Sequence, residues 1–162
     1  SGVIYTARDA AHARLCAALD AGEELPVDLR GQTVFYAGPT PTPPGKACGA
    51  IGPTTSMRMD AFTPRLLRYG VNAMIGKGER GEAVRAAIME TGAVYFAAIG
   101  GCAAYMAACV EALEVVAYDD LGTESIKRLT VRDLPLTVAL DAQGGDAYAM
   151  GAERYRELCQ NP

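Results

Sequence analysis

A segment rich in proline and glycine, residues 38–51, limits what this chain can fold into. It contains four prolines and three glycines. Proline lacks a backbone N–H and glycine weakens regular structure, so the segment fits neither a helix nor a central strand. We therefore predict a long loop. Such loops inside compact domains are usually functional or disordered, and we favour a functional role because this one leads directly into a polar turn.

On both sides of this loop, short apolar segments alternate with helical patterns. The expected strands are 3–5, 33–37, 71–75, 93–99, 115–118, 129–131 and 136–140, and the expected helices are 10–21, 57–67, 81–91, 102–113 and 146–158. Repeated strand–turn–helix units predict an α/β fold, whereas C-terminal strands without helices between them argue against a plain doubly wound sheet. We expect one domain over residues 1–162, with helices over a mixed sheet and a second small sheet.

Composition excludes several classes of protein. Half of the residues are hydrophobic and the net charge is −4, which favours a folded domain without general affinity for nucleic acid. No apolar run is long enough to cross a membrane, and no signal peptide opens the sequence. The five cysteines are scattered, and none has metal-ligand spacing, so we expect reduced thiols in the cytoplasm and no metal bound by this chain.

The turn at residues 52–60 reads Gly-Pro-Thr-Thr-Ser-Met-Arg-Met-Asp. Thr54 and Thr55 place hydroxyl groups at the expected start of the helix 57–67, where unpaired backbone N–H groups favour an anion. Arg58, in the first turn, adds a two-pronged donor that suits a carboxylate or phosphate. The alternative is that a threonine merely caps the helix and Arg58 is solvated.

Lys77 lies between Gly76 and Gly78, after an expected strand and before the helix 81–91. This order predicts a second anion-binding helix start, although the spacing is not that of a phosphate-binding P-loop. A lysine on a surface turn is an equally good interpretation.

Arg8 occurs at a third helix start, within Thr-Ala-Arg-Asp, which matches a capping box. His12 follows four residues later on the same helical face, where it either joins a binding pocket or bonds to a carbonyl. If the three helix starts converge, Arg8, Arg58 and Lys77 form a pocket for a small dicarboxylate. A threonine hydroxyl would need activation to act as a base there.

Together these segments resemble one family. The matching segments are Thr-Ala-Arg-Asp-Ala-Ala-His at 6–12, Tyr-Ala-Gly-Pro at 36–39, the turn 52–60, Ile-Gly-Lys-Gly at 75–78, Gly-Gly at 100–101 and Asp-Leu-Gly-Thr-Glu at 120–124. The chain is similar to the β subunit of class I fumarate hydratases and L(+)-tartrate dehydratases, which corresponds to the C-terminal domain of single-chain iron–sulfur fumarases. The resemblance covers most of the length.

The resemblance implies a swivelling β/β/α three-layer domain that docks on an α subunit, in an α2β2 assembly. The α subunit would carry a 4Fe–4S cluster, and this chain would bind none. Thr54, Arg58 and Lys77 would be catalytic, with Thr54 moving the proton on carbon. Arg8, Thr55 and His12 would join them in substrate binding. Relatives usually begin further upstream, so we expect some N-terminal strands of the family to be missing.

The expected reaction is the reversible dehydration of a 2-hydroxy dicarboxylate, with malate to fumarate slightly favoured over L-tartrate to oxaloacetate. A mesaconate-type hydratase subunit is a second enzyme hypothesis, which a roomier apolar wall would favour. A stand-alone module that binds small dicarboxylates without catalysis is the hypothesis from another class.

Overall fold

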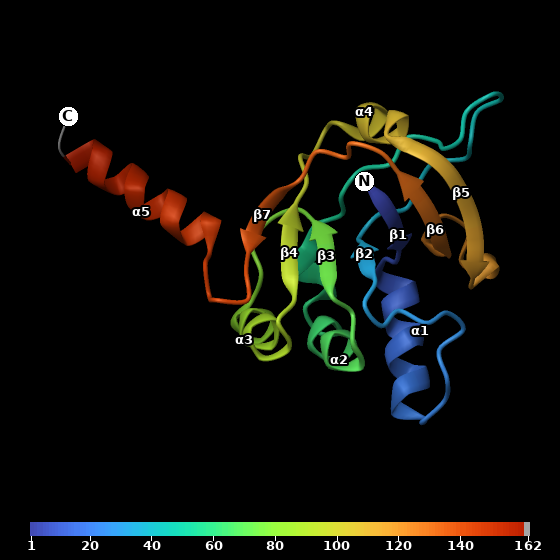
Figure 1. The fold of residues 1–162 in the computed structure, drawn as a ribbon, viewed down its shortest axis with the longest axis horizontal. Coiled ribbons are helices and arrows are strands. Elements are labelled where there is room, and N and C mark those ends of the chain that lie inside the picture. The colour runs from blue at the N-terminus through green and yellow to red at the C-terminus, as the bar shows by residue number, and fades with distance from the viewer. Residues whose placement is uncertain (161–162) are drawn as a thin grey trace.

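The computed structural model describes residues 1–160 of the 162-residue chain. Its strands form one mixed sheet in the order β5-β6-β1-β2-β3-β4-β7 (Figure 1). The strands are β1 Gly2–Thr6, β2 Thr33–Phe35, β3 Ala73–Gly76, β4 Val94–Ala97, β5 Val110–Ala117, β6 Ile126–Val131 and β7 Thr137–Leu140. The α-helices are α1 Asp9–Asp20, α2 Thr63–Tyr69, α3 Glu82–Thr91, α4 Ala103–Ala108 and α5 Ala147–Gln160, and the 3-10 helices are η1 Ser56–Met59 and η2 Asp119–Glu124.

The four central strands run in the same direction. β1 pairs in parallel with β2, β2 with β3, and β3 with β4, whereas β6 and β7 flank them as antiparallel neighbours. This confirms the predicted α/β class with a mixed sheet. Within residues 1–160, the C-terminal strands β6 and β7 join the central sheet and do not form the second small sheet that we expected.

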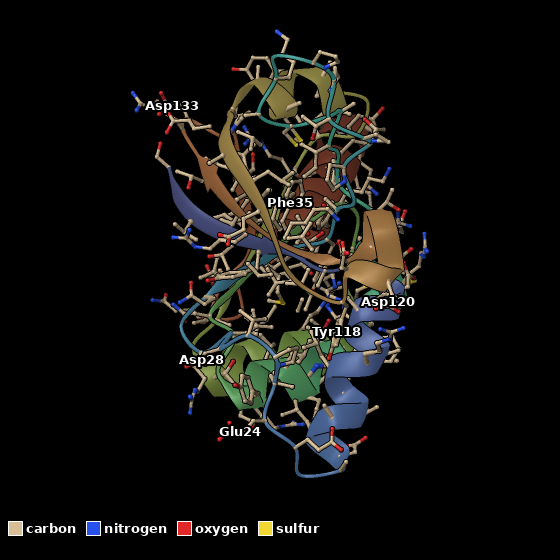
Figure 2. All side chains as sticks on the ribbon, turned by 90° about the vertical axis from the view of Figure 1, so that its right-hand side faces the viewer. Glu24, Asp28, Phe35, Tyr118, Asp120 and Asp133 are labelled. Carbon is tan, nitrogen blue, oxygen red and sulfur yellow. The ribbon has the colours of Figure 1, made fainter. Side chains whose placement is uncertain are left out.

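Side chains that alternate along the strands build a core on each face of the sheet. Val34 and Met74 belong to one buried cluster, which includes residues of α1, α2 and α3. Their neighbours Phe35 and Ile75 belong to the other, which includes residues of the loop 38–51 and α4. The molecule thus has helices, sheet, and then loop with α4 as successive layers, as Figure 2 shows on either side of the strands.

Two predicted helices are corrected. The helix expected at 102–113 ends at Ala108, and β5 begins at Val110 because this stretch pairs along its length with β6. The helix expected at 57–67 divides into η1 and α2. Pro64 occupies the first turn of α2, the helical position that tolerates a missing N–H.

The capping box predicted at Thr6–Asp9 is also wrong. Thr6 ends β1, and its hydroxyl donates a hydrogen bond to the carbonyl oxygen of Ser125. The cap of α1 comes instead from Glu124, whose Oε2 accepts a hydrogen bond of 2.9 Å from the backbone N–H of Ala10. A carboxylate at this end of a helix also suits the helix dipole.

The C-terminal helix α5 extends away from the rest of the molecule (Figure 1). None of its residues is buried, and Met150, Tyr155 and Leu158 are among the most exposed large apolar side chains. The helix predicted at 146–158 is therefore confirmed, but it contributes little to the core.

Candidate functional site at the carboxyl ends of the parallel strands

The candidate residues lie where the parallel strands end. Arg8 follows β1, and Lys77 directly follows β3. In open α/β sheets this edge is the usual place for a ligand. Gly38, after β2, leaves room here, because a Cβ would lie 2.7 Å from the carbonyl oxygen of Thr123 and 3.2 Å from Cδ of Arg8. Gly100, after β4, lies beside Lys77, and a Cβ there would be in ordinary contact with Nζ at 3.5 Å.

The polar turn is attached to this edge by its backbone. The N–H of Thr54 donates to the carbonyl of Tyr36 at 2.7 Å, just beyond β2. The N–H of Lys77 donates to the carbonyl of Thr54 at 3.3 Å, and the N–H of Ser56 donates to the carbonyl of Lys77 at 2.9 Å. Thr55 and Lys77 therefore form an isolated parallel bridge. The turn behaves as a short continuation of the sheet beside β3, which brings the two threonines next to Lys77.

Arg58 and Arg8 are brought together by one carboxylate. Arg58 makes a two-pronged pair with Asp9, with Nε 2.9 Å from Oδ1 and Nη2 2.7 Å from Oδ2. Nη2 of Arg8 lies 3.7 Å from the same Oδ2 and 3.4 Å from Oε1 of Glu124. The Arg58 side chain is 51% exposed and that of Arg8 is 24% exposed, so both guanidinium groups border solvent.

We predicted that Arg8, Arg58 and Lys77 lie at three α-helix starts, and this is wrong for Arg58 and Lys77. Arg58 lies in the single turn η1, which presents no extended helix dipole, and Lys77 precedes the cap of α3, Gly81, by several residues. The N–H of Gly81 is already bonded to Oδ2 of Asp60 at 2.6 Å. Only Arg8 stands at an α-helix start, as the N-terminal cap residue of α1.

His12 lies in the core beneath Arg8 and is only 1% exposed. Its Nδ1 is 2.9 Å from the carbonyl oxygen of Arg8, and its ring meets the Tyr36 ring edge-on at 5.1 Å between centroids. Burial lowers the pKa of His12 to about 4, so the imidazole is neutral at pH 7 and Nδ1–H donates to the carbonyl. The structure therefore shows the carbonyl-bonded alternative, and a role in binding substrate stays a prediction.

Beneath the turn lies a buried network that sequence reasoning missed. The Arg80 side chain is fully buried between the rings of Tyr36 and Tyr95, at 5.2 and 5.0 Å from their centroids. Its Nε donates to Oδ1 of Asp60 at 2.7 Å, and its Nη2 donates to the hydroxyl of Thr63 at 2.8 Å. A buried cation needs such partners. These partners are distant in sequence, so no local pattern indicated the network.

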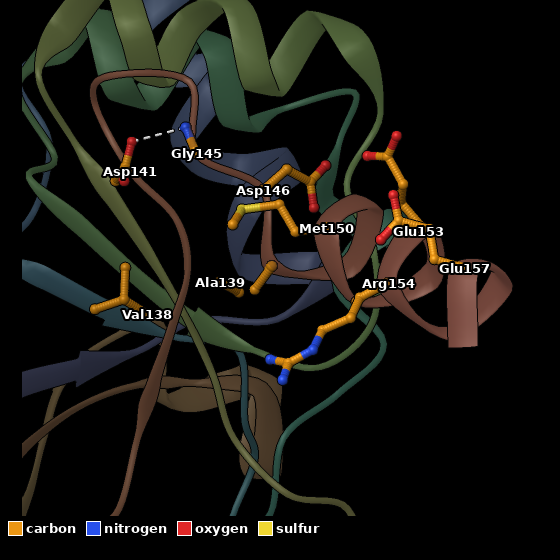
Figure 3. Close-up of a pocket in the computed structure, with 11 residues that line it drawn as sticks. Val138, Ala139, Asp141, Gly145, Asp146, Met150, Glu153, Arg154 and Glu157 are labelled. Carbon is orange, nitrogen blue, oxygen red and sulfur yellow. Dashed lines mark hydrogen bonds between the residues drawn. The ribbon is translucent and has the colours of Figure 1, made fainter. Parts of the chain in front are cut away.

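A separate hollow of about 660 Å³ lies between β7 and α5 (Figure 3). The residues that line it include Val138, Asp141, Asp146, Met150, Glu153 and Arg154. None of the candidate residues is among those that line it, so this hollow is separate from the candidate site.

The described residues contain no group of three or more His, Cys, Asp and Glu side chains that could hold a metal ion. All five cysteines, which lie within residues 1–160, are free thiols. Between residues 1 and 160 we also find no helix with the length and apolarity that a membrane crossing requires.

Comparison with known proteins finds one family model and several relatives that match most of this chain. A family model described as Fumarase C-terminus matches residues 1–151. The chain is 40% identical over 150 residues to "Fumarate hydratase class I, anaerobic" of Escherichia coli (strain K12), covering 91% of this chain and 27% of that protein. It is 35% identical over 151 residues to "Fumarate hydratase 2" of Leishmania major, covering 92% and 27%.

A shorter relative is matched over most of its length. This is "Putative L(+)-tartrate dehydratase subunit beta" of Methanocaldococcus jannaschii, 37% identical over 154 residues, with 91% of this chain and 79% of that protein covered. By contrast, the chain spans about a quarter of the length of the fumarate hydratases it matches.

Proposed function

The chain belongs to the fumarase C-terminus family, and we propose that it is the β subunit of a hydro-lyase that reversibly dehydrates a small 2-hydroxy dicarboxylate. Malate to fumarate is the favoured reaction, and L-tartrate to oxaloacetate is the close alternative. Activity would need an α subunit, since the candidate residues lie on an exposed edge that another chain would have to close.

The observation that carries this proposal is the shared carboxylate of Asp9. Its oxygens lie 2.7 Å from Arg58 and 3.7 Å from Arg8, so the two guanidinium groups are close enough to act on one small anion. Asp9 uses the Nε–Nη2 edge of Arg58. The outer Nη1–Nη2 edge, whose Nη1 makes no hydrogen bond within residues 1–160, would bind a substrate carboxylate in the two-pronged geometry that arginine favours.

The remaining roles are supported by the bridge that brings the turn beside the end of β3. Lys77 would contact the same substrate, and Thr55 would line it. Thr54 would accept the proton from the carbon next to a carboxylate, or deliver it in the reverse direction. The negative charge that then develops on that carboxylate would be stabilised by the arginines and Lys77. A threonine hydroxyl needs activation for this task, which a group of the partner or the substrate would supply.

The 4Fe–4S cluster is proposed to lie on the α subunit, as the resemblance to the class I fumarate hydratases implies. We place the complex in the cytoplasm, where free thiols such as these five remain reduced.

The test is an anaerobic assay of the two chains together. This chain is mixed with its candidate α subunit, the cluster is reconstituted, and product formation is followed by ultraviolet absorbance with malate or L-tartrate. We expect turnover only when both chains are present. Thr54→Val should abolish most of it, whereas Thr91→Val is a matched control because, among residues 1–160, the Thr91 hydroxyl bonds only to the carbonyl of Ala87 in α3.

The other outcomes are distinct. A complex with an intact cluster that dehydrates neither malate nor tartrate would show that the proposed substrate is wrong, and mesaconate hydration would then be assayed. Failure of the two chains to associate would favour the stand-alone dicarboxylate-binding module.

A further inference from the structure

A chain of two hydrogen bonds connects the polar turn to the loop that carries Lys77. The hydroxyl of Tyr95 donates to the carbonyl of Gly78 at 2.8 Å. The hydroxyl of Ser56 lies 2.9 Å from the same tyrosine oxygen. A phenol has one proton, so Ser56 must be the donor in that second bond. The direction of both bonds is therefore fixed, from Ser56 through Tyr95 to Gly78.

These groups enclose Lys77 on both sides. The backbone of Ser56 bonds to the carbonyl of Lys77, and its side chain fills the space above Gly76, where a Cβ would lie 1.9 Å from Oγ. Tyr95 holds the carbonyl of Gly78, the residue after Lys77. Gly76, before Lys77, is thus packed against Ser56 of the turn, and Gly78, after Lys77, is bonded to Tyr95 of β4.

Tyr95 itself has little freedom to move. It is fully buried, and the guanidinium of Arg80 lies 5.0 Å from its ring centroid. Arg80 is anchored in turn by Asp60. Burial also raises the pKa of the Tyr95 hydroxyl above its usual value, so this group stays a donor at neutral pH.

We propose that Tyr95 and Ser56 are positioning residues, which hold the Lys77 loop in register with Thr54 so that the ammonium group and the hydroxyl face the same ligand. The kinetic part of this inference rests on the proposed function. Neither residue needs to touch the substrate: each acts through the backbone on either side of Lys77. A buried hydroxyl that bonds to both partners is suited to this task, because losing it leaves the buried Ser56 hydroxyl without its acceptor and releases the carbonyl of Gly78.

Tyr36 provides a matched control. Its ring also stacks on Arg80, at 5.2 Å, and it is equally buried. However, its hydroxyl bonds to the hydroxyl of Thr63 and to Arg80, away from the Lys77 loop. Tyr36→Phe and Tyr95→Phe therefore each remove one buried hydroxyl from the same network, and only Tyr95→Phe should release Lys77.

The first readout needs no ligand. The full chain is treated with an amine-acetylating reagent, and the rate at Lys77 is compared with that at the exposed Lys46 by mass spectrometry. We expect Tyr95→Phe and Ser56→Ala to change the ratio at least threefold, and Tyr36→Phe to leave it unchanged. An unchanged ratio in Tyr95→Phe would overturn the inference.

The second readout is the kinetics of the complex with the α subunit. We expect Tyr95→Phe to lose at least tenfold in kcat/KM, while Tyr36→Phe stays within twofold at a similar loss of stability. Equal kinetic losses in the two variants would show a merely structural role and overturn the inference. If the wild-type complex turns over no dicarboxylate, the proposed function fails, and the acetylation ratio alone decides whether Tyr95 positions Lys77.

Discussion

Asp9 is the residue on which the geometry of the candidate site depends most directly. It is the first residue of α1, and it holds Arg58 from the turn and reaches Arg8 from the cap. Arginine and carboxylate match each other in shape, so a pair that is two-pronged also fixes the plane of the guanidinium. The orientation of Arg58 is therefore set by a residue that comes from a different part of the chain.

This geometry predicts the effect of Arg58→Lys. Lysine keeps the charge but has no planar fork, so it cannot form two-pronged pairs with Asp9 and with a substrate carboxylate. We expect at least a tenfold loss in kcat/KM in the reconstituted complex, which corresponds to about 1.4 kcal/mol. Arg65→Lys is the control, since Arg65 pairs with Asp20 on the surface. Unchanged kinetics in Arg58→Lys would remove this arginine from the site.

The sequence predicts these residues better than it predicts their surroundings. Thr54 and Lys77 belong to short motifs with glycine or proline next to them, and the structure brings them together through a backbone bridge. Asp9 and Asp60 also lie in such motifs, but their pairing with Arg58 and Arg80 was not predicted, because these partners lie 49 and 20 residues away. Contacts of this kind follow from the fold and not from local pattern.

At the scale of elements, the end of β3 is shaped by a glycine that has no unusual backbone angle. A Cβ at Gly76 would lie 1.9 Å from Oγ of Ser56 and 3.0 Å from the Tyr36 ring, and both neighbours are fully buried. We expect Gly76→Ala to lower the free energy of unfolding by about 1–3 kcal/mol, as overpacking does. Chemical denaturation measures this change.

The matched control is Gly151→Ala in α5, where a Cβ would meet nothing within 4 Å. Alanine is roughly 0.5–1 kcal/mol better than glycine inside an exposed helix, so this variant should be neutral or more stable. Adding Ser56→Gly to Gly76→Ala should recover part of the lost stability. No recovery would contradict the proposed steric cause.

The elements that sequence reasoning placed wrongly share a physical cause. The helix expected at 102–113 rested on its alanines, but residues 110–113 belong to β5, because pairing with β6 decides their conformation. Likewise, the cap of α1 comes from Glu124, which lies 114 residues beyond Ala10. Both outcomes are set by tertiary contacts, which local propensity does not contain.

At the scale of the whole molecule, the burial of His12 couples folding to pH. The pKa is lowered from 6.5 to about 4 in the folded chain, so as the pH falls the unfolded chain binds the proton first. The stability that the neutral, buried His12 contributes is complete above pH 6.5, and it is lost progressively as the pH falls towards 4. The slope from this group is at most about 1.4 kcal/mol per pH unit.

Chemical denaturation of the wild type and of His12→Gln between pH 7.5 and pH 4 measures this effect. The carboxylates titrate in both proteins, so the difference in slope belongs to His12. We expect the variant to lose less stability on acidification. If the variant does not fold, an NMR titration of the His12 imidazole in the wild type replaces the comparison of the two proteins. A pKa near 6.5 would contradict the burial of His12 described here.

Arg8 and Arg58 are paired with Asp9 and Glu124, and this pairing also determines how far the electric field of the site extends into solvent. Two positive and two negative groups at close range largely cancel, so their combined electric field decays faster with distance than that of a single ion. The net charge of −4 repels anions weakly on top of this. A dianion would therefore be recognised by short-range contacts with the site and not by long-range attraction. Its rate of association would change little with ionic strength.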